Sequence, residues 1–159
     1  MKYLSIPGLV CVSICLTVNC GPSPVKKWKK SFDTVIEKLA AVPVTEEGDP
    51  ADFKNFYAVS EELSAISQDS EYAADLLKDI LITSEYIPVR AGAAMTLGRI
   101  GARNDAYALI HALSDSSSFV KHKAHKALQK LTREEFGQDK RAWLEWWNNL
   151  KKKEAEHDE

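Results

Sequence analysis

Three histidines lie close together in the second half of this 159-residue chain and are the first candidates for chemistry. His122 and His125 are three residues apart in a segment with helical periodicity, and His111 precedes them. Two histidines on one helix face could begin a zinc site, but zinc needs a third ligand and commonly a fourth. Asp115 is the only carboxylate between His111 and His122, and no cysteine follows Cys20. We interpret the histidines as part of a solvated helix face, and expect no metal and no cofactor.

The sequence also lacks the usual patterns of nucleophilic and phosphate chemistry. It contains no G-x-S-x-G elbow and no G-x-x-x-x-G-K-[ST] loop. Its acidic residues form neighbouring pairs at 46–47, 61–62 and 134–135. Neighbouring residues on a helix point about 100° apart, so such pairs do not make a catalytic dyad. We therefore expect that the protein is not an enzyme.

The distribution of charge argues against nucleic acid as a partner. The formal net charge is -2, whereas phosphate-binding domains normally carry a clear basic excess. Lysines cluster at 26–30 and at 151–153. The first cluster either contacts anionic headgroups or belongs to a solvated tether. The second cluster is expected to interact favourably with the negative, C-terminal end of a helix dipole.

All the cysteines fall within the first twenty residues, at positions 11, 15 and 20. Lys2 and the apolar run from Leu4 to Val18 have the layout of a secretory signal peptide. The run is shorter than the roughly 20 apolar residues of a membrane span. We expect the remainder to be exported, without disulfides, and held together by its core alone.

Cys20 follows the apolar run directly and precedes the tether Gly-Pro-Ser-Pro. This arrangement resembles the lipobox of bacterial lipoproteins, although Thr17 and Asn19 depart from its usual Leu and Gly or Ala. The resemblance implies that Cys20 carries acyl chains such as palmitate and anchors the protein in the bacterial envelope, at the outer membrane or the periplasmic face. If Cys20 is part of an ordinary signal peptide instead, the protein is periplasmic or secreted.

From residue 24 onward the periodicity is helical, and most glycines and prolines lie between the periodic segments. Apolar stripes run through 25–39, 56–66 and 76–81, with a break at 43–52. Beyond residue 88 the sequence repeats itself with an offset of 31: Val89-Arg90 matches Val120-Lys121, and Leu97 matches Leu128. A repeat of two short helices at this period predicts an all-α fold, an α-solenoid.

Small side chains such as Ala93 and Ala124 predict close approach between helices of successive repeats. Gly101 is a predicted C-cap, Asp105 a predicted cap of the next helix, and Asp115 with the serines 116–118 a predicted turn.

Three tryptophans near the C-terminus, Trp143, Trp146 and Trp147, lie within five residues. On a helix opening at Asp139 they form one stripe with Leu150. This stripe predicts a helix that covers the end of the solenoid, with a ligand platform as the alternative.

The repeat resembles a HEAT repeat of the short bacterial type, the subgroup named after phycobilisome lyases. The resemblance covers about residues 70 to 150, and its matching positions are Val89, Arg90, Ala93, Ala94, Leu97, Gly98, Ile100, Gly101, Leu109, Leu113 and Asp115. We divide the chain into a signal peptide (1–19), an anchor and tether (20–24), a HEAT-like solenoid (25–150, clearest at 70–135) and a charged tail (151–159).

The fold and the resemblance together predict a protein-protein interaction scaffold or adaptor, anchored to the membrane by lipid. The face carrying Tyr107, His111, His122 and Lys126 is the candidate partner surface. Arg90 either pairs with Asp79 or Asp115 of a neighbouring unit or contacts the partner.

Two other functions remain open at this point. A small-ligand or chromophore-binding, lyase-like protein would have a deep aromatic pocket near Tyr86, Phe119 or Trp143. A purely structural envelope component would have no specific partner surface.

Overall fold

The computed structural model describes residues 24–45, 47, 49–68 and 72–157. The predicted signal peptide and Cys20 lie outside the described residues. The helices are α1 (Pro24–Ala40), α2 (Phe53–Ser67), α3 (Ala73–Thr83), α4 (Ile87–Ile100), η1 (Arg103–Asp105, a 3-10 turn), α5 (Ala106–Ala112), α6 (Ser118–Thr132) and α7 (Lys140–His157).

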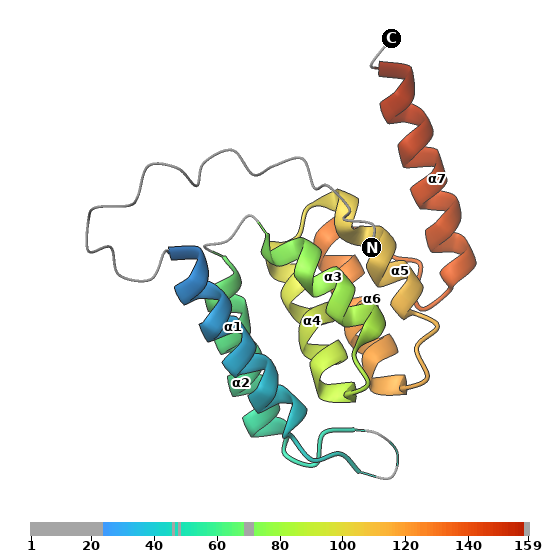
Figure 1. Ribbon diagram of the computed structural model, residues 1–159. Coiled ribbons are helices and arrows are strands. Elements are labelled where there is room, and N and C mark those ends of the chain that lie inside the picture. Colours follow the sequence, from blue (N-terminus) through green and yellow to red (C-terminus); the bar gives the residue numbers. More distant parts are fainter. Residues whose placement is uncertain (1–23, 46, 48, 69–71, 158–159) are drawn as a thin grey trace, which may run out of the picture.

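Successive helices pair and stack into two layers (Figure 1). Helices α2, α4 and α6 lie side by side in one layer, whereas α1, α3 and α5 cover them. The last helix, α7, packs on α5 at the end of the stack. The predicted all-α solenoid is confirmed, and residues 24–68 contribute a helix pair of their own.

Helix α4 lies at the centre of the stack, with ten of its fourteen residues buried. Small residues let α6 come very close to it, since a Cβ atom added at Gly98 would lie 2.7 Å from Cα of Ala127. Ala93, Ala94 and Ala124 are fully buried. The predicted close approach of the two repeats is therefore present, and Gly98 is its tightest point among the described glycines.

Gly101 and Asp105 hold their predicted positions in the turn after α4, but they act there in other ways than predicted. Gly101 is the C-cap, but its φ of -69° is available to any residue. Glycine is needed because a Cβ would lie 2.5 Å from the carbonyl oxygen of Leu97. Asp105 occupies the predicted N-cap position of α5, but its side chain makes no capping hydrogen bond to that helix. Its carboxylate accepts a hydrogen bond from the amide of Ala102 at 2.7 Å instead.

The N-terminus of α7 forms as the sequence predicted. The Asp139 carboxylate accepts hydrogen bonds from the amides of Arg141 and Ala142. Trp143 is completely buried, and its indole N–H donates to the carbonyl of Gly137 at 2.8 Å. Trp146 and Trp147 are only partly buried against the core. The predicted covering of the stack therefore rests mainly on Trp143.

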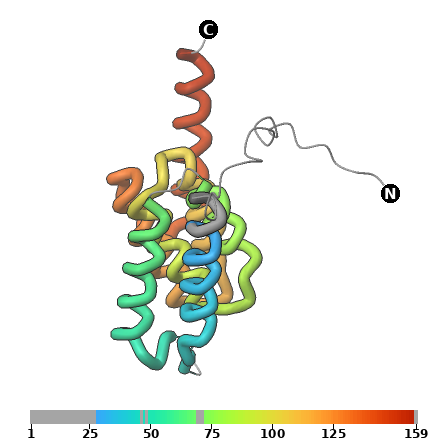
Figure 2. Tube along the Cα trace, turned by 60° about the vertical axis from the view of Figure 1, so that its left-hand side comes forward, coloured from blue at the N-terminus to red at the C-terminus, as the bar shows by residue number. Residues whose placement is uncertain are grey.

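Helix α7 is longer than its apolar stripe. It continues to His157 and extends away from the body of the protein (Figure 2). The predicted tail from residue 151 is thus helical as far as His157, and the lysines 151–153 lie before the last turn rather than at the helix end. Among the described residues, no helix has the length and apolar character needed to cross a membrane.

The contact between α4 and α6 gives a test of the fold. We expect Gly98→Ala to lower the free energy of unfolding by about 1–3 kcal/mol, because the new methyl meets the backbone of Ala127 and forces the helices apart. Gly92→Ala is the matched comparison, since it adds the same methyl to the same helix but meets side-chain atoms of Leu39 and Ser60 and no backbone atom of a neighbouring helix within 3.5 Å. Urea unfolding measures both. Equal stabilities for the two variants would contradict this account of the packing.

Candidate functional site: an aromatic groove between α3, α5 and α7

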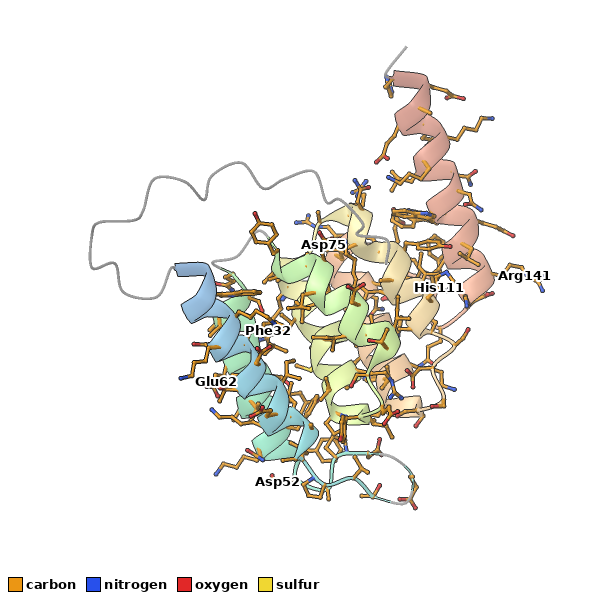
Figure 3. All side chains as sticks on the ribbon, in the orientation of Figure 1. Phe32, Asp52, Glu62, Asp75, His111 and Arg141 are labelled. Atoms are coloured by element: carbon orange, nitrogen blue, oxygen red, sulfur yellow. The ribbon has the colours of Figure 1, made fainter. Side chains whose placement is uncertain are left out.

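An open groove of about 690 Å³ lies where α3, α5 and α7 meet. Figure 3 marks His111 on the α5 side of it. Eight residues line it, and we call it the aromatic groove: Lys78, Asp79, Ile82, Asn104, Tyr107, Ala108, His111 and Trp147.

Aromatic rings from two helices form one wall of the groove. Tyr107 and His111 are four residues apart on α5, so they project from the same face, and their ring centroids are 4.6 Å apart. Helix α7 brings Trp147 to within 5.8 Å of the Tyr107 ring. The opposite wall carries Ile82 of α3, which is 65% exposed, while Tyr107 is 48% exposed. The groove therefore presents apolar surface to water.

The lysines at the groove are already paired. The Lys78 ammonium contacts Asp75 at 2.7 Å and the buried Asp105 at 2.9 Å, so it links α3 to the start of α5. These two hydrogen bonds raise the pKa of Lys78. This ion pair also explains why the Asp105 side chain does not cap α5.

On the opposite side, Lys151 lies over the Trp147 ring at 4.8 Å from its centroid. Its ammonium donates to Asn104 and to Glu154, each at 2.8 Å. By contrast, the exposed carboxylate of Asp79 forms no ion pair with any residue that the structure describes.

The predicted partner face is divided between the two layers. Tyr107 and His111 lie together in the aromatic groove. His122 and Lys126 are exposed on α6, in the other layer, and neither lines this groove. Burial lowers the pKa of His122, and the nearby charges of Lys123 and Lys126 lower it further. The spacing along each helix was predicted correctly, but the combination of the two helices into one face was not.

Arg90 is held by an ion pair and by backbone carbonyls. Its guanidinium makes a bidentate contact with Asp115, with Nε to Oδ2 at 2.7 Å and NH2 to Oδ1 at 2.8 Å. Its remaining NH1 donates to the carbonyls of Ser84 and Glu85. The side chain of Arg90 is 11% exposed. Of the two predicted roles, this geometry supports the ion pair between repeats, with Asp115 rather than Asp79 as the partner.

The histidines have separate surroundings. His111 is in the aromatic groove, His122 is exposed, and the Nε2 atom of His125 is buried without a hydrogen-bond partner. Within the described part of the chain, no group of three His, Cys, Asp or Glu side chains is placed to hold a metal ion.

The residues proposed for a chromophore pocket do not come together. Tyr86 is 55% exposed, whereas Phe119 and Trp143 are buried. Phe119 packs edge-on against Phe56, and Trp143 packs against Phe136. The deep-pocket alternative therefore has no support from these positions.

Six groove residues were not predicted as partner-binding residues by the sequence analysis: Lys78, Asp79, Ile82, Asn104, Ala108 and Trp147. Asp79 and Ile82 are spaced i, i+3 on the exposed side of α3, and an isoleucine outside the apolar stripe was the available signal. Trp147 was assigned to covering the stack, with a ligand platform as the alternative.

The sequence model of the HEAT-repeat family matches residues 58–144, which is more than half of the chain and extends from α2 into α7. Searches of curated proteins and of solved structures each returned no match.

The ion pair between Arg90 and Asp115 gives a prediction for stability. We expect Asp115→Asn to lower the free energy of unfolding by about 3 kcal/mol, because it leaves a buried guanidinium without its counter-charge. Asp33→Asn removes a carboxylate from the exposed pair with Lys29 and should cost less than about 1 kcal/mol. Urea unfolding at neutral pH distinguishes the two.

The same ion pair sets a pH dependence. Burial would raise the pKa of Asp115, but the hydrogen bonds from Arg90 and from the Ser117 amide outweigh it and lower the pKa. A carboxyl group with a lowered pKa stabilises the fold above its unfolded pKa, and that stabilisation is lost as the pH falls through the folded pKa. We therefore expect wild type to lose its advantage over Asp115→Asn below about pH 4. An advantage that persists undiminished in acid would contradict this assignment.

Proposed function

This chain belongs to the HEAT-repeat family, and we propose that it is a protein-interaction scaffold whose partner docks in the aromatic groove. HEAT repeats generally mediate protein interactions, and the family is generally non-enzymatic. We extend both properties to this protein.

The observation that carries the proposal is the exposed apolar surface of the groove. Tyr107 and Ile82 both line it, and both are about half exposed or more. Aromatic residues are enriched in protein interfaces, where they supply large contact areas from few rotatable bonds. Docking of a partner segment would remove these side chains from water, which favours association.

The groove is also held in place before any partner arrives. The ion pair from Lys78 to Asp105 joins α3 to η1, directly before α5, and the hydrogen bond from Lys151 to Asn104 joins α7 to the same turn. Preformed walls reduce the entropy that binding must otherwise overcome. Recognition would then be stereochemical, with no reaction step.

We also propose that the scaffold is lipid-anchored through Cys20 in the bacterial envelope. The support is the sequence around Cys20: an apolar run before it and a short tether rich in proline and glycine after it. With the anchor in place, the groove would meet partners at the membrane surface.

Photo-crosslinking in cells tests the docking site. We expect a benzoylphenylalanine at position 107 to give a discrete adduct with another protein, and Ile82→Asp to weaken that adduct because it places a charge on the apolar wall. The same probe at position 126, on the exposed side of α6, is the control. An adduct that forms only at position 126 would place docking on the other layer.

Mass spectrometry of the mature protein tests the anchor. We expect acyl chains on Cys20, with each buried CH₂ contributing about 0.8 kcal/mol to membrane binding. Cys20→Ala should release the protein from the membrane fraction, whereas Cys15→Ala should leave it anchored. A wild-type Cys20 without lipid would refute the proposed anchor.

A further inference from the structure

We propose that the aromatic groove recognises a basic segment of its partner, with an arginine or lysine against Asp79 and Tyr107 and a neighbouring apolar side chain over Ile82. This inference rests on the proposed function and specifies the chemistry of the partner.

The first argument is the balance of charge around the groove. Lys78, which lines the groove, and Lys151, which lies over the ring of the lining residue Trp147, are both engaged by carboxylates. The four carboxylates concerned are those of Asp75, Asp79, Asp105 and Glu154. Among the lining residues and their ion-pair partners, negative charge is therefore in excess.

The second argument is the position of that excess. Lys78 is shared by two aspartates and has little capacity to attract an acidic ligand. Asp79 lies beside it on α3 with its carboxylate exposed and without an ion pair to any described residue. A cationic side chain entering the groove would meet this free carboxylate, whereas an acidic one would be repelled by it.

The third argument is that the aromatic wall already holds a cation. The Lys151 ammonium lies 4.8 Å from the centre of the Trp147 ring, while the side-chain amide oxygen of Asn104 accepts its hydrogen bond. The ring of Tyr107, 5.8 Å from that of Trp147, remains half exposed. An arginine of the partner can stack on this exposed ring in the same manner.

The apolar part of the proposed segment follows from the spacing on α3. Ile82 lies three residues after Asp79, on the same side of the helix. At 65% exposure it is the most exposed large hydrophobic residue in the part of the chain that the structure describes. A large apolar residue next to the basic one would cover it.

A randomised heptapeptide library, panned on the full mature protein, tests this inference. We expect the selected peptides to carry Arg or Lys beside a large apolar residue, and to bind Asp79→Lys roughly tenfold more weakly or worse. Panning on Asp79→Lys should instead enrich Asp or Glu. Asp79→Asn keeps the side-chain shape and serves if the charge reversal disturbs folding, and Asp33→Lys, on α1, is the matched control.

The outcomes separate this inference from the proposed function. Selected peptides that lose binding with Tyr107→Ala or Ile82→Ser would confirm the groove as the docking site. If those peptides are acidic or neutral and still bind Asp79→Lys, the inference of a basic segment is wrong. If no selected peptide depends on Tyr107 or Ile82, the proposed function fails and the basic segment with it. Thermal melting of each variant shows whether it retains the fold.

Discussion

The close contact between α4 and α6 is the constraint on which the rest of the structure depends. At Gly98 and Ala127 the two backbones leave no space for an added methyl group. Such an approach requires a helix built from small residues, and α4 accordingly buries ten of fourteen positions on several faces at once. A helix buried in this way gains little from an amphipathic stripe of its own. Its stability comes from the neighbours that surround it, which are α1, α2, α3 and α6.

The buried position of α4 explains the ion pair at its first turn. A guanidinium in such a place must be satisfied internally, because an unpaired buried charge is strongly destabilising. Arg90 meets this requirement with Asp115 and with the carbonyls of Ser84 and Glu85, which belong to the turn between α3 and α4. Asp115 also accepts a hydrogen bond from the amide of Ser117 at the start of α6. One side chain thus fixes the relative position of two turns in successive repeats. In the second repeat the equivalent residue is Lys121, which cannot reproduce the planar bidentate contact.

The features that depend on one helix or one repeat were predictable from the sequence. The offset of 31 residues predicted the positions of α4 and α6. The stripe of tryptophans predicted which face of α7 packs on the core, and Asp139 was correctly predicted to cap that helix. The features that depend on how helices are oriented across layers were not. The side-chain contacts of Asp105 were not predicted, because its ion-pair partner, Lys78, is 27 residues away on α3 and the 3-10 turn that ends at Asp105 brings its carboxylate back to the amide of Ala102. His122 and Lys126 were joined to Tyr107 and His111 because helical spacing says which residues share a helix face, and not which faces share a side of the protein.

The position of the groove follows from the lengths of the helices in the outer layer. Helix α5 has only seven residues, against eleven in α3 and eighteen in α7. This short helix contributes Tyr107, Ala108 and His111 to the groove, and they leave Ile82 of α3 65% exposed. The inner layer cannot compensate, because its helices are already drawn together by glycine and alanine. The small residues that hold the solenoid together thus leave apolar surface uncovered in the outer layer, and that surface is where a partner would complete the packing.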